Sequence, residues 1–228
     1  MKLKPPFKSI DSKYPFCDWI VRYFPTDYQK MVYLEPFCGT ASVFLNKHPS
    51  TEEVINDIEP KITKLMRSIR DQHKDLMDIL RKVKYTKENF INACEAVTFI
   101  NDLYEGANEY IIRNMGKERV FKSGDQQKWL KLINCIPKLA KRLEHSYIFN
   151  KPAIDVINAY NKADTLLYID PPLDINHDKF AVLLHDYKGK VIISGQSACI
   201  YSELYKDWKC IKKKPVKINN HECVWYNY

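Results

Sequence analysis

The sequence predicts an α/β protein whose sheet is interrupted by a mostly helical insertion. Short apolar runs rich in β-branched residues alternate with helical stretches, which is typical of a sheet covered by helices. The chain has 228 residues, 45% hydrophobic and 28% charged, which is enough for one sizeable core but not for two independent domains. Glycine is scarce, with 6 residues, so we expect few sharp turns, and the position of each glycine is informative.

The first elements are predicted to be a strand, a tight loop, a helix and a second strand. Residues 31–35 form a short apolar run, and a loop then leads into helical character at residues 41–45. Residues 53–57 have the pattern of a second strand. Pro60 is suited to the first turn of a long helix over residues 60–80. Together these elements form a β-α-β unit.

The middle of the chain, residues 61–142, is predicted to be a helical insertion. Its charged, helical pattern breaks at residues 113–124, where two of the six glycines fall, which indicates a loop or small hairpin. Strand patterns return after the insertion, with helical stretches between the first three. These strands are expected at residues 146–149, 165–169, 190–194 and 222–226. The sequence therefore predicts one sheet domain, residues 1–60 and 143–228, that carries the insertion.

Charge and cysteine content narrow the class of protein. Lys and Arg number 36 against 28 Asp and Glu, so the formal charge is +8. This charge suits a polyanionic partner, although a solvated basic surface explains it equally well. No apolar run reaches the length of a membrane span and the N-terminus lacks a secretory apolar region, so we expect a cytoplasmic protein. The seven cysteines are widely spaced without a Cys-x-x-Cys pair, which indicates reduced thiols and no structural metal.

Two positions at the ends of the first two strands suit a ligand. The loop containing Gly39 leaves a strand and opens a helix, which places backbone N–H groups at the carboxyl edge of the sheet. This geometry suits a cofactor, but Gly39 is also typical of an ordinary turn. Asp57, at the end of the second strand, is suited either to accept hydrogen bonds from ribose hydroxyls or to cap the helix that follows.

The most specific pattern is Asp170-Pro171-Pro172, directly after the apolar strand at residues 165–169. Two consecutive prolines have a fixed φ and no N–H, so the segment presents a rigid carbonyl beside the carboxylate of Asp170. Two such acceptors can hold both hydrogens of one amino group. The alternative is a proline-stiffened strand exit without chemistry.

In this order the motifs resemble those of the Dam-type DNA adenine-N6 methyltransferases, which use S-adenosylmethionine. The resemblance covers nearly the full chain. Residues 34–45 resemble the family's Glu-Pro-Phe-x-Gly-x-Gly cofactor loop, residues 55–59 its Asn-Asp-x-Asn ribose motif, and residues 168–173 its Asp-Pro-Pro-Tyr motif. Its Lys-Trp-x-Gly-Gly-Lys segment, a later core strand and the closing strand correspond to residues 8–13, 190–195 and 222–227.

The resemblance implies a Rossmann-like methyltransferase sheet, S-adenosylmethionine as cofactor and double-stranded DNA as partner. The amino group of a flipped adenine would be held by the motif formed by Asp170, Pro171, Pro172 and Leu173. The cofactor site would consist of Lys13, Glu35, Phe37, Cys38, Gly39, Thr40, Asp57 and Asp170. Target recognition would fall to residues 61–142, in which the candidate DNA contacts are Arg113, Lys117, Arg119 and Lys122. For these four residues the alternative is a solvated basic loop.

Several positions depart from the family pattern. Asp11-Ser12 replaces a pair of glycines, and Ala41 replaces a third glycine. Pro152-Ala153 replaces an Asp-Phe pair that the family uses near the cofactor's adenine. Leu173 replaces the tyrosine that stacks on the flipped base, an interaction worth about 1–3 kcal/mol per base. These departures lower the cofactor affinity and the base capture that we expect.

Three hypotheses follow from these patterns. The first is an active methyltransferase on adenine in DNA, with direct transfer that needs no metal. The second is a non-catalytic relative that binds nucleic acid, cofactor or a protein partner. The third is a methyltransferase acting on another amino group, in RNA or a free nucleotide. Retention of Asp170 and its prolines favours the enzymes, whereas Leu173 in place of tyrosine favours the other two hypotheses.

Overall fold

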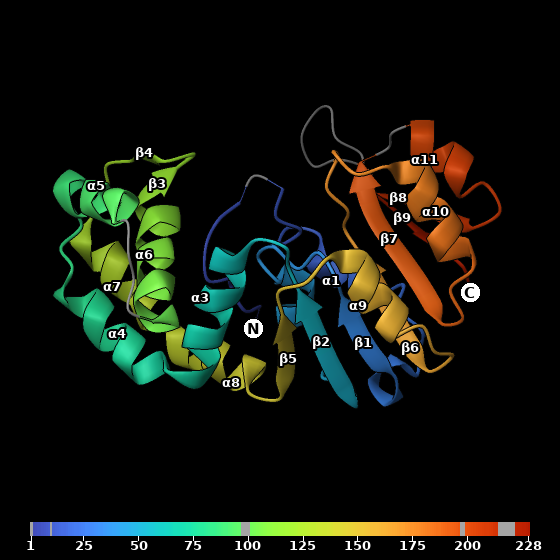
Figure 1. The fold of residues 1–228 in the computed structure, drawn as a ribbon, viewed down its shortest axis with the longest axis horizontal. Coiled ribbons are helices and arrows are strands. Elements are labelled where there is room, and N and C mark those ends of the chain that lie inside the picture. Colours follow the sequence, from blue (N-terminus) through green and yellow to red (C-terminus); the bar gives the residue numbers. More distant parts are fainter. Residues whose placement is uncertain (1, 10, 97–100, 197–198, 214–221) are drawn as a thin grey trace.

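A seven-stranded sheet with the strand order β5-β2-β1-β6-β7-β9-β8 forms the centre of the protein (Figure 1). The computed structural model describes residues 2–9, 11–96, 101–196, 199–213 and 222–228. The strands from β5 to β7 run parallel, whereas β9 runs antiparallel to both of its neighbours. This topology confirms the predicted α/β fold with a Rossmann-like sheet. The strands are β1 (Val32–Glu35), β2 (Glu52–Asn56), β5 (Ser146–Phe149), β6 (Thr165–Ile169), β7 (Lys190–Gln196), β8 (Lys209–Lys213) and β9 (Glu222–Tyr226).

Helices cover both faces of the sheet, which explains why its strands are apolar along their whole length. Successive side chains of a strand point to opposite faces, so Tyr33 and Leu34 of β1 belong to two different hydrophobic cores. The core around Tyr33 includes side chains of α1 (Cys17–Val21), α2 (Ser42–Asn46) and α3 (Pro60–Asp71). The core around Leu34 includes side chains of α9 (Ala153–Ala159), α10 (His177–His185) and α11 (Cys199–Leu204).

The helical segment between β2 and β5 forms a group of its own. Figure 1 shows α4 to α7 gathered with the hairpin of β3 and β4 beyond the β5 edge of the sheet. Helix α3 packs against α6 and α8 and so links this group to the sheet. In the described part of the chain, no helix combines the length and apolar character that a membrane span needs. The elements are α4 (His73–Lys82), α5 (Lys87–Glu95), α6 (Asp102–Met115), β3 (Gly116–Lys117), β4 (Val120–Phe121), α7 (Gln126–Ile133) and α8 (Ile136–Leu143).

A two-residue turn joins β3 to β4, which confirms the loop or small hairpin predicted within residues 113–124. The turn residues Glu118 and Arg119 have φ values of 52° and 62°, as the common hairpin turn with two left-handed residues requires. Gly116 is needed for space, because a Cβ there would lie 2.4 Å from a ring carbon of Phe90. Lys117 and Arg119 therefore lie on a defined hairpin, whereas Arg113 belongs to α6.

Two elements differ from the sequence-based expectation. The helix predicted over residues 60–80 is two helices, α3 and α4, which meet at Gln72, where φ is −135° and ψ is 34°. Both helices pack against α6 and α8, but α3 also packs against β5 of the sheet, whereas α4 also packs against α7. The sequence pattern also did not predict β8. Its exposed Lys209 and Lys212 lie on an edge strand, where apolar alternation is weak.

Candidate active site

Three carboxylates stand at the carboxyl ends of three adjacent strands. Glu35 is the last residue of β1, Asp57 follows β2, and Asp170 follows β6. Since β1 lies between β2 and β6 and all three run parallel, these residues meet at one edge of the sheet. Ligands of open α/β sheets bind at this edge. The fold therefore brings together residues that the sequence placed at separate strand ends.

Asp170 shares the ammonium group of Lys13 with a second carboxylate, Glu222. The Lys13 Nζ lies 3.1 Å from Asp170 Oδ1 and 2.9 Å from Glu222 Oε1. Burial raises the pKa of Asp170 to about 7. The positive charge of Lys13 lowers this pKa, whereas the negative charges of Glu222 and Asp11 raise it further. Burial alone would lower the pKa of Lys13, but the negative charges of Asp170 and Glu222 outweigh the effect of burial and raise this pKa.

Glu35 is almost fully buried and carries its proton at neutral pH. The hydroxyl of Tyr33 donates to Glu35 Oε2 at 2.6 Å, and the backbone N–H of Phe44 donates to the same oxygen at 3.2 Å. Burial raises the pKa of Glu35 to about 8, although these two donors oppose the shift and the charge of Asp170 adds to it. Glu35 therefore joins β1 to α2 as a neutral acid at the base of the cofactor loop.

The Gly39 loop is fixed to β2 through Asp57. The N–H of Gly39 donates to Asp57 Oδ2 at 2.8 Å, and the N–H of Glu59 donates to Asp57 Oδ1 at 2.9 Å. Gly39 has a φ of 47°, and a Cβ built there would meet nothing within 4 Å, so the space beside it is open. The N-cap residue of α3 is Glu59, so the alternative in which Asp57 is the N-cap of this helix is wrong.

Ser12, one of the departures from the family pattern, binds the cofactor loop. Its hydroxyl lies 3.0 Å from the hydroxyls of Thr40 and of Ser42, which are themselves 2.7 Å apart. Ala41, between them, is fully buried and has a φ of 52°, in the left-handed region that favours glycine. Sequence reasoning missed the role of Ser12, although the serines and threonine of these two motifs were a signal.

Asn56 is a second residue that sequence reasoning missed. Its fully buried amide donates to the carbonyls of Pro36 at 2.9 Å and of Lys151 at 3.0 Å, and its Oδ1 accepts the N–H of Lys151 at 3.0 Å. Asn56, the last residue of β2, therefore joins this strand to the segments that follow β1 and β5. The signal for this role was its position directly before Asp57 in the ribose-like motif.

The remaining predicted site residues lie at or near this edge of the sheet and differ in how deeply they are buried. Phe37 is half-buried and packs edge-on against Phe180, with ring centroids 5.7 Å apart. Cys38 and Thr40 are buried, and burial raises the pKa of the Cys38 thiol. Leu173 is 90% exposed. After Asp170, Pro171 is half-buried and Pro172 is exposed, so the motif runs from the sheet edge outward to solvent.

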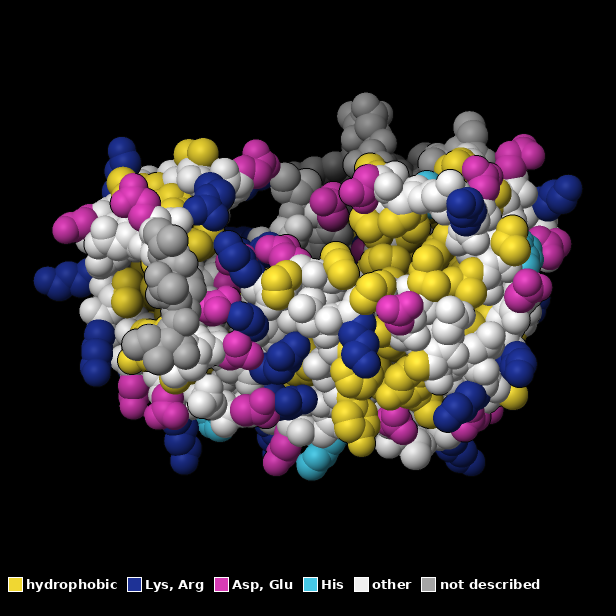
Figure 2. Space-filling model, viewed as in Figure 1, with side chains coloured by type: hydrophobic (Ala, Val, Ile, Leu, Met, Phe, Trp, Pro, Cys, Tyr) yellow, Lys and Arg dark blue, Asp and Glu magenta, His cyan; other side chains and the backbone are white. Residues whose placement is uncertain are grey.

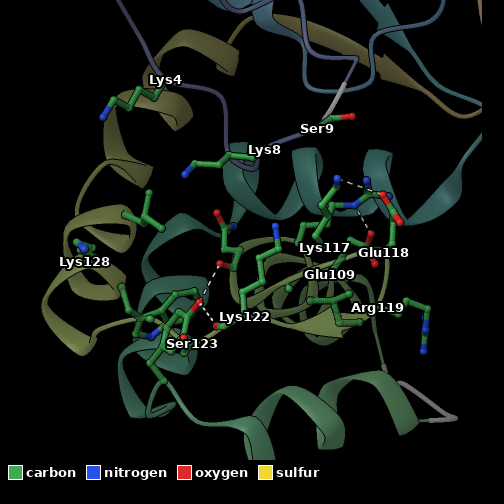
Figure 3. Close-up of a pocket in the computed structure, with 18 of the residues that line it drawn as sticks. Lys4, Lys8, Ser9, Glu109, Lys117, Glu118, Arg119, Lys122, Ser123 and Lys128 are labelled. Carbon is green, nitrogen blue, oxygen red and sulfur yellow. Dashed lines mark hydrogen bonds and ion pairs between the residues drawn. The ribbon is translucent and has the colours of Figure 1, made fainter.

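A basic groove of about 1060 Å³ lies between the N-terminal segment and the helical group. Figure 2 shows the surface hollowed between the helical group and the sheet, with Lys and Arg side chains beside the hollow. In Figure 3, Lys8 of the N-terminal segment, Lys128 of α7 and Lys122 near the hairpin surround the groove. Its basic lining residues outnumber its acidic ones, which are Asp11, Glu59, Glu109, Glu118 and Asp125. The basic ones are Lys4, Lys8, Lys61, Arg113, Lys117, Arg119, Lys122, Lys128 and Lys131.

All four candidate DNA contacts line the groove, but their environments differ. Arg113 forms ion pairs with Glu59, at 2.7 Å, and with Glu109, and its guanidinium lies 4.6 Å from the ring centre of Phe7. Arg119 donates to the carbonyl of Cys94 at 2.7 Å. Arg113 is thus held inside the protein, whereas the hairpin residues Lys117 and Arg119 are exposed on the groove side.

The family model for "D12 class N6 adenine-specific DNA methyltransferase" matches residues 10–190. The chain belongs to this family. The match includes the Gly39 loop, Asp57, the whole helical insertion and Asp170, and it confirms the family that the motifs predicted. The predicted enzyme class, DNA adenine-N6 methyltransferase, follows from this membership. The matched range ends at Lys190, so Glu222 lies outside it.

Two solved structures resemble the D12-family fold of this chain. Both are of the rRNA methyltransferase aviRa from Streptomyces viridochromogenes. One has 10% sequence identity and a TM-score of 0.46, and the comparison covers 93% of this chain and 83% of that chain. The other has 11% identity and a TM-score of 0.48, with 97% and 86% covered. A comparison with curated proteins gave no match. The assignment therefore depends on the family match.

Proposed function

We propose that this D12-family enzyme transfers the methyl group of S-adenosylmethionine to N6 of an adenine flipped out of double-stranded DNA. One observation carries the proposal. The carboxylate of Asp170 and the left-handed loop at Gly39 follow adjacent parallel strands, β6 and β1, at the same edge of the sheet. An amino group held at Asp170 would lie beside a cofactor held at the Gly39 loop, as direct transfer between two bound molecules requires.

The residues around the Gly39 loop fit the cofactor that the family implies. The open space beside Gly39 lets a ligand approach the backbone closely. Each carboxylate oxygen of Asp57 accepts one backbone N–H, which leaves each oxygen a lone pair for a ribose hydroxyl. When bound, S-adenosylmethionine supplies a methyl group on a positively charged sulfur, and the electron pair of the broken C–S bond stays on that sulfur. We assign Phe37, Cys38 and Thr40 to the same site.

Asp170 and Pro171 are suited to hold the target amino group. The carboxylate and the Pro171 carbonyl each accept one amino hydrogen, which draws the nitrogen lone pair out of conjugation with the base. The lone pair can then attack the methyl carbon, and the two acceptors act most strongly in the transition state. The nitrogen loses one hydrogen as a proton after transfer. Asp170, with a pKa of about 7, is suited to accept that proton.

The basic groove is suited to the DNA backbone. The exposed Lys117, Arg119 and Lys122 of the hairpin region form one side, and Lys4 and Lys8 of the N-terminal segment form another. Phosphate contacts of this kind position a duplex without reading its sequence. Asp11 lines the groove and its negative charge contributes to the raised pKa of Asp170, which supports a groove that leads toward the site. A duplex in the groove would thus place its bases near Asp170.

The proposal is tested by separating cofactor binding from transfer in Asp170→Ala. We expect calorimetric titration to show S-adenosylmethionine binding within a few-fold of the wild type, and methyl transfer into unmethylated DNA to be abolished. Asp174→Ala removes the same charge from an exposed residue four positions on and is expected to leave both unchanged. Equal transfer by Asp170→Ala and the wild type would rule out the assignment of Asp170.

A further inference from the structure

Lys13 contacts one of the two carboxylate oxygens of Asp170, the group that the proposed mechanism needs. Its ammonium lies 3.1 Å from Asp170 Oδ1, so an incoming amino group must compete with a positive charge for that carboxylate. Glu222 offers the same ammonium a second acceptor at 2.9 Å. Without Glu222, the whole charge of Lys13 would act on Asp170, and this stronger ion pair would hinder the binding of a neutral donor. Glu222 shares the ammonium of Lys13 and so weakens the competition between Lys13 and the amino group for Asp170.

We propose that Glu222 is a positioning residue that holds Lys13, so that Asp170 can present its carboxylate to the target amino group. This inference rests on the proposed function, since it assigns a role around Asp170 in the same transfer reaction. Lys13 would stay bound to Glu222 when its contact with Asp170 is exchanged for the amino group. The ammonium then remains near the site without blocking it.

The position of Glu222 suits this role. Glu222 begins β9, which pairs with β7 on one side and with the edge strand β8 on the other, so its backbone is held by strands on both sides. The residue is 4% exposed, and among the described residues its Oε1 has no aligned hydrogen-bond donor. A buried carboxylate in this state needs a counter-charge, and Lys13 supplies it. We therefore expect Glu222 to stay paired with Lys13.

Among the residues that the structure describes, few charges act on Asp170 besides this pair. The described groups that interact with it are Lys13 and Asp11 from the N-terminal segment, Glu222 from β9, Glu35 from β1, Tyr168 from β6 and Tyr201 from α11. Burial raises the pKa of Glu35 to about 8 and that of Tyr201 to about 12, and it also raises the pKa of Tyr168, so these three are neutral near pH 7. The balance at Asp170 therefore depends on Lys13, Glu222 and Asp11.

Glu222→Gln removes one of these charges and releases Lys13 to Asp170. Both effects favour the ionised carboxylate, so we expect the titration midpoint of Asp170 to fall by about one pH unit or more. A pKa of Asp170 that is lower by one unit corresponds to a tenfold stronger ion pair with Lys13. The target amino group must displace this ion pair, so the rate of methyl transfer on the high-pH plateau should fall about tenfold. The acid limb of the rate profile should move to lower pH together with the midpoint.

The test is a carbon-13 NMR titration of the Asp170 carboxyl in the free protein, assigned with Asp170→Asn, combined with the pH profile of single-turnover transfer. Glu203→Gln, which removes an exposed carboxylate of α11, is the matched control and should change neither. Glu222→Asp keeps the charge but draws it back by one methylene, so its midpoint should fall between those of the wild type and Glu222→Gln. Thermal unfolding checks that each variant is folded.

An Asp170 midpoint in folded Glu222→Gln that stays within about 0.3 units of the wild type would overturn the inference, because a shift of one unit is expected. If Glu222→Gln does not fold, an unchanged midpoint and plateau rate in Glu222→Asp would overturn it in the same way. The NMR midpoint needs no turnover, so it judges Glu222 separately from the proposed function. Failure of the wild type to methylate adenine would contradict the proposed function alone.

Discussion

Leu173→Tyr is expected to improve methyl transfer because it adds an aromatic ring where the family stacks the flipped base. Leu173 is 90% exposed at the outer end of the Asp170 motif. An added ring there meets solvent rather than a packed core, so the cost of overpacking, about 1–3 kcal/mol in a core, does not arise. The retained Asp170 and Pro171 hold the amino group in both proteins. The change therefore tests stacking alone.

The size of the effect follows from the stacking energy. Stacking on an aromatic side chain is worth about 1–3 kcal/mol per base, of which leucine already supplies a part through apolar contact. At about 1.4 kcal/mol per factor of ten, kcat/KM should rise by roughly five- to a hundred-fold. Because the side chain is exposed, the free energy of unfolding should change by less than about 0.5 kcal/mol.

The assay is methyl incorporation into unmethylated DNA under kcat/KM conditions, with Leu173→Phe and Leu173→Ala as controls. Phenylalanine should reproduce the gain without the hydroxyl, and alanine should lower kcat/KM below that of the wild type. If Leu173→Tyr lowers kcat/KM while its thermal unfolding is unchanged, the pocket is built around leucine and the stacking argument is refuted.

Three further perturbations follow from the contacts of the site and the groove. Charge reversal in the hairpin region should flatten the salt dependence of DNA binding by about 0.9 in log-log slope per lost contact, and an unchanged slope would place the DNA elsewhere. It is applied to Lys117, Arg119 and Lys122, with Lys162, Lys188 and Lys206, which lie outside the groove, as the control set. Arg113→Ala should instead lower the free energy of unfolding by about 1–3 kcal/mol, measured by denaturant titration, because it leaves the buried Glu109 unpaired. Glu35 has a folded pKa of about 8 against an ordinary 4.5, so the native state holds the extra proton between these values and stability falls as pH rises. Glu35→Gln should remove this slope and stabilise the fold by on the order of 3 kcal/mol at pH 7 and by less than about 1 kcal/mol at pH 5, and parallel stability curves for the two proteins would contradict the raised pKa.

The central strands and the hairpin could be predicted because local patterns determine them. Residues 165–169 are apolar on both faces, since helices cover both sides of β6. Gly39 could be singled out because a left-handed turn between a strand and a helix favours glycine. The break between α3 and α4 at Gln72 could not be predicted, because it depends on which helices each half packs against and not on a helix-breaking residue.

The ion pairs of the site could not be predicted, because they join residues far apart in the sequence. Lys13 meets Glu222 only because β9 inserts between β7 and β8 in the reverse direction. Arg113 lies in a basic segment, as a DNA contact would, and local composition does not reveal that Glu59, 54 residues away, holds its guanidinium. The charged residues could be identified in the sequence, but the residues with which they form ion pairs could be identified only from the topology of the fold.

The chemical identity of the methylated base tests the central claim most directly. The wild-type protein is incubated with labelled S-adenosylmethionine and unmethylated double-stranded DNA, and in parallel with RNA, and the digested nucleosides are separated by mass spectrometry. The arrangement of Asp170 and Pro171 beside the Gly39 loop predicts N6-methyldeoxyadenosine from DNA, and its loss in Asp170→Ala. Label in N4-methylcytosine alone, in RNA alone, or in DNA adenine at an unchanged rate in Asp170→Ala would contradict the account.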